Sequence, residues 1–166
     1  MTKIMLISGL VGAGKSTYAR RLAKEESAIR FSIDEWMIAL FKADFPKQLD
    51  FEWSMERIYK IEEQVWSVVE QLIENGTPVI LDFGLLQREH RQKFYDWAEI
   101  NNFTIETHVI EADKDIRWQR VLNRNLEKGD TYSLEVNKEM FDFCEDLYER
   151  PEADELSRCK FVQTDK

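Results

Sequence analysis

The stretch MLISGLVGAGKSTYARRL, from Met5 to Leu22, decides the fold of this chain. An apolar run leads into a glycine-rich loop, which is followed by Lys, Ser and Thr and then by alternating basic and apolar residues. The segment from Gly9 to Ser16 matches the phosphate-binding motif G-x-x-x-x-G-K-[ST] at every fixed position. Glycines let the backbone curl so that N–H groups point at phosphate oxygens, and the following helix adds its positive end.

The motif assigns roles to individual side chains. Lys15 is expected to reach the β- and γ-phosphates of a nucleoside triphosphate, and the Ser16 hydroxyl is expected to ligate Mg²⁺. The residues expected to contact the nucleotide are Gly9, Leu10, Val11, Gly12, Ala13, Gly14, Lys15, Ser16 and Thr17. The motif leaves open whether the triphosphate is hydrolysed to do work or used to phosphorylate another molecule.

Strands and helices are expected to alternate along the chain. Apolar runs predict strands over Lys3–Ser8, Ile29–Ile33, Pro78–Leu81, Phe103–Glu111 and Cys159–Gln163. Apolar spacing and turn residues predict helices over Gly14–Glu25, Glu35–Phe41, Met55–Glu74, Arg88–Asn101, Asp115–Asn125 and Glu135–Tyr148. Ser54 is the expected N-cap of the third helix, after a loop over Lys42–Trp53. This alternation favours an α/β fold with a parallel sheet, in one domain over residues 1–166.

Composition narrows the function. Of the 166 residues, 43% are hydrophobic and 33% are charged, as in soluble globular proteins. The net charge of −9 disfavours a long nucleic-acid partner and favours a small molecule. No apolar run is long enough to span a membrane, and the first residues do not read as a signal peptide. We therefore expect a cytoplasmic protein with Cys144 and Cys159 as reduced thiols.

Asp34 ends the second predicted strand, in FSIDEW. In open α/β sheets, ligands bind outside the carboxyl ends of the strands, where a carboxylate can accept the proton of an attacking hydroxyl. The alternative is that Asp34 caps the next helix, and one aspartate could do both.

Asp82 ends the third predicted strand, in VILDFGLLQREHRQKF. It is expected to order Mg²⁺ through water or to bind the acceptor. Arg88 and Arg91 follow on one face of a helix and would hold the acceptor or support the site. The alternative for both arginines is a solvated basic helix start.

Arg117, Arg120 and Arg124 recur at spacings of three and four and can share a helical face. A polar segment with Gly129 follows, which predicts a lid over about residues 124–133. Arg120 and Arg124 are the better candidates for closing over the triphosphate and neutralising charge on the transferred group. The alternative is a charged helix surface. Trp36, Phe41 and Trp53 line the acceptor pocket or pack in the core.

Together these motifs resemble a branch of small P-loop kinases that includes polynucleotide kinase, chloramphenicol phosphotransferase and the zeta toxins, many of them called AAA-family ATP-binding proteins. The segments that carry the resemblance are GLVGAGKST at 9–17, SID at 32–34, ILDFGLLQREHRQKF at 80–94, RVLNRN at 120–125 and CEDLYERPEADEL at 144–156. The resemblance implies a P-loop NTPase three-layer sandwich with five parallel strands in order 2-3-1-4-5. It also implies that Asp34 is the base and that Arg120 and Arg124 are the lid arginines.

Two departures bear on the acceptor. Ile33 and Glu35 flank Asp34, where polynucleotide kinases usually place an arginine, and Phe83-Gly84-Leu85 replaces a polar segment after the third strand. The sequence thus predicts an ATP- and Mg²⁺-dependent kinase that phosphorylates a hydroxyl of a small molecule, as a monomer or homodimer. Two alternatives stay open: a nucleic-acid 5′-hydroxyl kinase, and a nucleotide-binding regulatory or toxin-like module without an acceptor.

Overall fold

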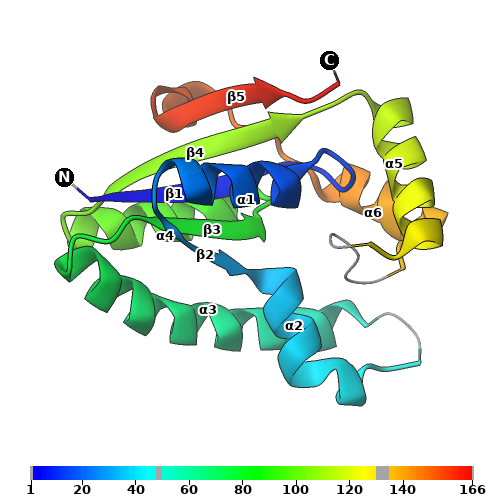
Figure 1. Ribbon diagram of the computed structural model, residues 1–166, viewed down its shortest axis with the longest axis horizontal. Helices are drawn as coiled ribbons and strands as arrows, with labels where there is room; N and C mark the ends of the chain where they lie inside the picture. Colours follow the sequence, from blue (N-terminus) through cyan, green and yellow to red (C-terminus); the bar gives the residue numbers. More distant parts are fainter. Residues whose placement is uncertain (1, 48–49, 130–134, 166) are drawn as a thin grey trace.

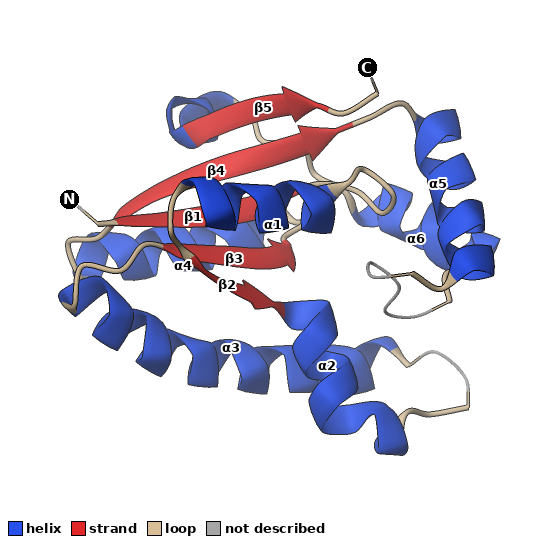
Figure 2. Cartoon of the chain, in the orientation of Figure 1, coloured by secondary structure: helices blue, strands red, loops and turns tan. Residues whose placement is uncertain are grey.

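The computed structural model describes residues 2–47, 50–129 and 135–165. Its sheet has five parallel strands in the order β2-β3-β1-β4-β5 (Figure 2). The strands are β1 (Lys3–Ser8), β2 (Ile29–Ser32), β3 (Val79–Gly84), β4 (Thr104–Glu111) and β5 (Cys159–Gln163). The fold class and the strand order predicted from the sequence are confirmed.

Helices cover both faces of this sheet (Figure 1). Met5 and Ile7 of β1 share one apolar core with α1 (Lys15–Glu25). Ile4 and Leu6 share the other core with α3 (Phe51–Glu74) and α4 (Arg88–Ile100). Successive side chains of a strand point to opposite faces, so a strand buried on both faces reads as a continuous apolar run.

α2 (Ile33–Phe41), α5 (Lys114–Glu127) and α6 (Lys138–Leu147) lie at the end of the sheet where the strands terminate (Figure 1). A short 3₁₀ helix, Lys42–Asp44, continues the chain from α2, and a second, Ala153–Arg158, leads into the start of β5. Within the described ranges, no helix combines the length and the apolar character needed to cross a bilayer.

α2 and α3 begin two and four residues earlier than the sequence predicted. α2 begins at Ile33, and the Ser32 hydroxyl caps it by accepting a hydrogen bond from the Glu35 N–H at 3.4 Å. Asp34 therefore lies inside the first turn, and the capping alternative for Asp34 is wrong. α3 begins at Phe51, because the Asp50 carboxylate caps it by accepting from the Trp53 N–H at 2.9 Å.

Ser54, the expected cap of α3, lies within the first turn and donates its hydroxyl to the Asp50 carbonyl at 2.8 Å. The early start is accompanied by aromatic packing, because the Trp53 ring meets the rings of Phe41 and Phe45 edge-on at 6.5 and 5.7 Å. Side chains distant from the cap thus favour the longer helix, and the preceding loop is shorter than predicted.

Candidate active site

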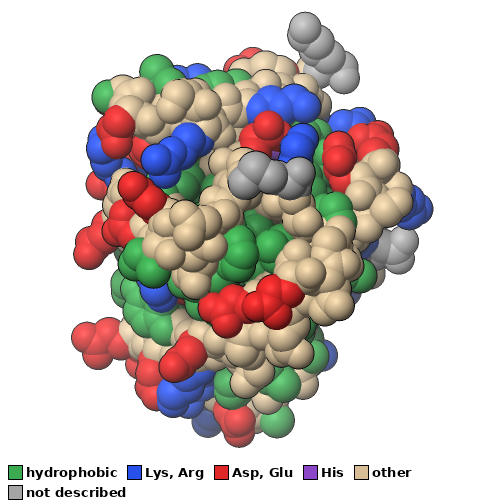
Figure 3. Space-filling view, turned by 90° about the vertical axis from the view of Figure 1, so that its left-hand side faces the viewer, with side chains coloured by type: hydrophobic (Ala, Val, Ile, Leu, Met, Phe, Trp, Pro, Cys, Tyr) green, Lys and Arg blue, Asp and Glu red, His purple; other side chains and the backbone are tan. Residues whose placement is uncertain are grey.

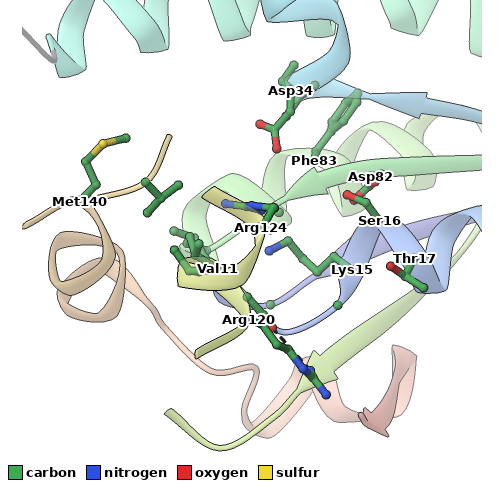
Figure 4. A pocket seen from close by; sticks show the side chains of 18 residues that line it. Val11, Lys15, Ser16, Thr17, Asp34, Asp82, Phe83, Arg120, Arg124 and Met140 are labelled. Carbon is green, nitrogen blue, oxygen red and sulfur yellow. Dashed lines mark hydrogen bonds between the residues drawn. The ribbon is translucent and has the colours of Figure 1, made fainter. Parts of the chain in front are cut away.

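A cavity of about 470 Å³ opens at the carboxyl ends of the central strands (Figure 4). Its walls come from the loop between β1 and α1, from the first residues of α1 and α2, from the end of β3, and from α5 and α6. Lys15, Ser16, Asp34, Asp82 and Arg124 all line it. Side chains that the sequence spreads over more than a hundred residues therefore face one space.

The glycine loop has a backbone that side chains would disrupt. Gly9 has φ of 143°, and a Cβ on it would lie 2.3 Å from the carbonyl oxygen of Ile110. Gly12 has φ of 80°, and a Cβ there would lie 2.4 Å from the carbonyl oxygen of Arg117. The loop is therefore held close to β4 and α5. Its peptide groups can curl around an anion as the motif requires.

The loop is also braced from the C-terminal end of the described chain. The Thr164 hydroxyl donates to the Ala13 carbonyl at 2.6 Å. The Arg120 guanidinium donates to the Thr164 hydroxyl oxygen at 2.9 Å and to the Thr164 carbonyl at 2.5 Å. Figure 4 shows the Arg120 guanidinium pointing away from Lys15. Arg120 thus lines the cavity but directs its charge at the brace, whereas the sequence predicted a lid arginine.

Lys15 and Arg124 bring two cationic side chains together. The Lys15 ammonium group donates to the Leu10 carbonyl at 2.9 Å, which holds it across the mouth of the loop. Burial lowers the pKa of Lys15, while the nearby carboxylates of Asp82 and Asp34 oppose that shift. Arg124 reaches in from α5, and its guanidinium lies near the Lys15 side chain (Figure 4). Two cations beside backbone N–H groups suit a polyphosphate.

Asp34 faces this cationic region from α2. Its carboxylate makes no hydrogen bond or ion pair with any other residue that the structure describes. Asp34 is an exposed residue that water reaches through the cavity. Partial desolvation by the surrounding protein raises the pKa of the Asp34 carboxyl, with Lys15 opposing the effect and Asp82 adding to it. An ionisable group with a raised pKa in a cavity has the properties of a proton acceptor.

Asp82 is nearly inaccessible and is paired with Arg30. The Arg30 guanidinium donates to one Asp82 carboxylate oxygen at 3.1 and 2.8 Å and to Glu35 at 3.0 Å. Arg30 was not predicted from the sequence. The sequence carried a signal, because a charged residue in a strand of the sheet requires a partner. The strand register, which sets Ser32 opposite Asp82, shows why that partner is Asp82.

The residues that could hold Mg²⁺ are Ser16, in the first turn of α1, and Asp82 acting through water. Within residues 2–47, 50–129 and 135–165, no group of three or more His, Cys, Asp or Glu side chains could hold a metal ion. Mg²⁺ at a phosphate site takes most of its ligands from water and phosphate oxygens, so a single hydroxyl with a nearby carboxylate fits it.

Arg88 and Arg91 lie outside the cavity. Arg91 is completely buried, and its guanidinium donates to the Glu155 carboxylate at 2.7 and 3.0 Å and to the carbonyls of Leu85 and Leu86 at 3.1 and 3.2 Å. Arg88 is half-exposed and pairs with Asp154 at 2.6 Å. Neither contacts an acceptor in the cavity as the sequence suggested. Arg91 instead fixes the segment that follows β3 through its bonds to Leu85 and Leu86. The last residue of β3, Gly84, accepts a hydrogen bond from the Gly9 N–H at 3.1 Å through its carbonyl.

Removing the Arg91 charge should therefore cost stability. We expect Arg91→Gln to lower the free energy of unfolding by about 3–5 kcal/mol, because it leaves Glu155 buried without its partner. The measurement is urea denaturation followed by circular dichroism. Arg88→Gln is the matched control on the same helix and should change little, because its ion pair is open to water. Equal losses in both variants would contradict the structural role of Arg91.

The remaining residues that the sequence singled out pack in or near the core, or lie in the predicted lid. Trp36 packs edge-on against Phe31 at 5.9 Å, next to the core, and Phe41 also packs against the core. Arg117 is buried and donates to the Ala112 and Val11 carbonyls and to Glu145. Within the predicted lid, α5 continues through Glu127, and residues 130–133 lie outside the described part of the chain.

The fold and this cavity define a P-loop nucleotide-binding protein with the fold of P-loop kinases. The AAA domain family matches residues 4–151, and the chain belongs to that family. No curated protein sequence matches the chain.

Several solved structures share the fold. Kti12 from Chaetomium thermophilum, in complex with ADP-AlF3, has a TM-score of 0.70 and 16% identity over 96% of this chain and 88% of its own. A gluconokinase from Sinorhizobium meliloti has a TM-score of 0.63 and 16% identity over 97% and 82% of the two chains. A chain of the Pnkp1/Rnl/Hen1 RNA repair complex has a TM-score of 0.63 and 22% identity over 88% of this chain and 43% of its own.

Proposed function

We propose that residues 1–166 form one cytoplasmic kinase domain that transfers the γ-phosphoryl group of ATP to a hydroxyl of a small molecule, with Mg²⁺. The observation that supports this most is the position of Asp34. Its carboxylate lines the same cavity as Lys15 and the glycine loop but makes no hydrogen bond or ion pair with the described residues. A carboxylate facing a phosphate cradle can accept a proton from an alcohol placed between them.

The proposed reaction is an in-line displacement. The alcohol oxygen bonds to the γ-phosphorus, the bond from that phosphorus to the β–γ bridging oxygen breaks, and ADP leaves. The alcohol proton moves to the Asp34 carboxylate, whose raised pKa makes it a stronger base than an ordinary aspartate. Lys15 and Arg124 stabilise negative charge on the transferred group. Mg²⁺, when bound, would neutralise phosphate charge beside Ser16.

The charge distribution favours a small acceptor over a nucleic acid. The net charge is −9, whereas nucleic-acid affinity comes mainly from Lys and Arg meeting phosphates. Figure 3 shows the face at the amino ends of the strands, opposite the cavity; basic and acidic side chains of the described residues are interspersed there, so this face offers no continuous basic surface to a nucleic acid. A gluconokinase among the structures of similar fold supports small-molecule phosphorylation by such a scaffold.

The test is transfer of labelled γ-phosphate from Mg-ATP to a panel of sugars, nucleosides, amino alcohols, hydroxylated antibiotics and a 5′-hydroxyl oligonucleotide, with Lys15→Ala as the blank. A labelled small molecule is the expected result. Label on the oligonucleotide alone would overturn the argument from charge. Label released only as phosphate, at one slow rate with every acceptor, would favour a nucleotide-binding regulatory module.

The pH dependence should carry the signature of Asp34. The ionised carboxylate is the active form, so transfer is present above the pKa of Asp34 and is lost as pH falls through it. Because desolvation raises that pKa, the acidic limb of kcat/KM should lie above the ordinary value of 3.8. The measurement is the initial rate against pH at saturating Mg-ATP and at acceptor concentrations well below KM. The Glu35→Gln variant should keep this acidic limb. If the same limb persisted in the residual activity of Asp34→Asn, Asp34 would not be the proton acceptor.

A further inference from the structure

A second cavity, of about 340 Å³, adjoins the first and shares Asp34 and Met140 with it. Figure 4 shows these two side chains on opposite sides of the space above the glycine loop. The new walls come from α2, from the segment around Phe45 and Pro46, from the start of α3, and from the start of α6. Such a volume is in the range of small-ligand pockets, and its position puts a ligand directly against Asp34.

Most of the lining is apolar. The apolar side chains include Met37, Ile38, Phe45, Trp53, Ile58 and Met140. The Trp53 ring is held in place by the Arg57 guanidinium, which stacks over it at 3.8 Å, and by the edge contacts with Phe41 and Phe45 described above. Phe143 of α6 meets Phe51 of α3 edge-on at 5.6 Å, so α6 is packed against the helix that bears Trp53. The apolar surface is therefore formed before a ligand arrives.

The polar lining carries negative charge. It consists of Asp34, Asp50, Ser54 and Asn137. Asp50 and Asn137 are occupied as the N-caps of α3 and α6, where they accept from the N–H groups of Trp53 and Met140. Among the described residues that line this cavity there is no Lys or Arg. A carboxylate or phosphate entering it would meet two carboxylates on its walls, whereas the nearby cations lie behind Trp53 (Arg57) or in the first cavity (Lys15 and Arg124) and do not line it. A neutral or cationic group would meet no such repulsion.

We propose that this cavity binds the acceptor and that the acceptor is an uncharged or positively charged alcohol with an apolar body, placed with its hydroxyl at Asp34. The proposal rests on the proposed kinase function and narrows it. Acceptors that carry a carboxylate or a phosphate next to the reacting hydroxyl are disfavoured, and such groups occur in sugar acids, sugar phosphates and polynucleotides. The apolar walls supply affinity, and the Asp34 carboxylate supplies orientation through a hydrogen bond from the hydroxyl.

The first experiment compares three alcohols that share a phenylpropyl skeleton and differ in charge: phenylalaninol, which is cationic, 3-phenyl-1-propanol, which is neutral, and 3-phenyllactate, which is anionic. Binding to the full chain is measured by ligand-observed NMR in the presence of Mg²⁺ and a non-hydrolysable ATP analogue. We expect the cationic and neutral alcohols to bind at least about tenfold more tightly than the anion.

The second experiment adds a positive charge to the cavity. Ser54 lines it, so Ser54→Lys should strengthen phenyllactate binding and weaken phenylalaninol binding, each by about tenfold. Ser67→Lys is the matched control, because Ser67 is an exposed residue of the same α3 helix that does not line either cavity. It should leave all three affinities unchanged.

The outcomes separate this proposal from the kinase assignment. Equal binding of the three alcohols, tightest binding of the anion, binding of none at millimolar concentration, or equal effects of the two lysine variants would each overturn the acceptor site. Selective binding of the cationic and neutral alcohols without ATP-dependent phosphorylation of either would support the chemistry of the cavity and count against the kinase function.

Discussion

Replacing Asp34 with Asn is expected to lower kcat for phosphoryl transfer by about 10²–10⁴-fold and to leave ATP binding close to that of the unmodified protein. Asn has nearly the same shape but cannot take up the alcohol proton. ATP affinity should persist, because the glycine loop, Lys15 and Arg124 are separate from the first turn of α2. The measurements are steady-state transfer with the best acceptor and calorimetric titration with Mg-ATP.

The same substitution should not destabilise the fold. Ser32 caps α2, and the Asp34 carboxylate makes no hydrogen bond or ion pair with the described residues, so the Asn substitution breaks no such contact. Glu35→Gln is the adjacent control. Glu35 pairs with Arg20 and Arg30 and does not line the first cavity, so the Glu35→Gln variant should keep phosphoryl transfer. A large drop in Tm for Asp34→Asn with transfer retained would show that the carboxylate is structural.

Lys15→Ala is expected to have the other large effect. We expect a loss of at least about 10²-fold in kcat together with weaker ATP binding, because the ammonium group is a charged donor aimed into the phosphate cradle. Thermal unfolding should be nearly unchanged, since Lys15 makes one described hydrogen bond, to the Leu10 carbonyl. Both quantities can be measured on one preparation, by transfer of labelled phosphate and by differential scanning fluorimetry.

Lys24→Ala is the matched control for this variant, because Lys24 is an exposed lysine in the last turn of the same helix. It should retain both transfer and ATP binding. If Lys15→Ala kept full turnover, the phosphate-cradle assignment would be wrong, and the cavity would need a different ligand.

The central part of the fold could be predicted from local sequence. The run before Gly9 and the run that contains Ile80 are apolar at consecutive positions, which is typical of strands covered on both faces. The strand order came from the resemblance and is confirmed. The ends of elements were less predictable. Asp50 and Ser54 are both good N-caps, and the packing of Phe41 and Phe45 around Trp53 favours the earlier one.

The candidate site was predictable where one motif or one strand end carries it. The structure brings Lys15, Ser16, Asp34, Asp82 and Arg124 to one cavity, although their roles stay predictions. The positions of Arg91 and Arg120 were not predictable. Each forms hydrogen bonds to a residue more than 40 positions away, Arg91 to Glu155 and Arg120 to Thr164. An arginine on a helix face has the same local pattern whether it faces a ligand or a distant carboxylate.

The residues on the acceptor side of the site also could not be predicted from local sequence patterns. Met140 lines both cavities, but in the sequence it is one apolar residue of an amphipathic helix. Its place depends on how α6 packs across the end of the sheet, which involves contacts such as Phe143 with Phe51. The sequence shows only that Phe83-Gly84-Leu85 replaces a polar segment after the third strand, and of these residues Phe83 and Gly84 line the first cavity.

The hydrogen bond from Thr164 to Ala13 spans 151 positions in the sequence and has a consequence during synthesis. The glycine loop is synthesised about 151 residues before the threonine that braces it. At about 5–20 residues per second, the two are separated by roughly 8–30 s. Throughout that interval a nascent chain carries the nucleotide motif without the strand and the threonine that hold it in shape. We therefore expect ATP to assist folding only after translation has passed β5, and to be of no use to the growing chain before then.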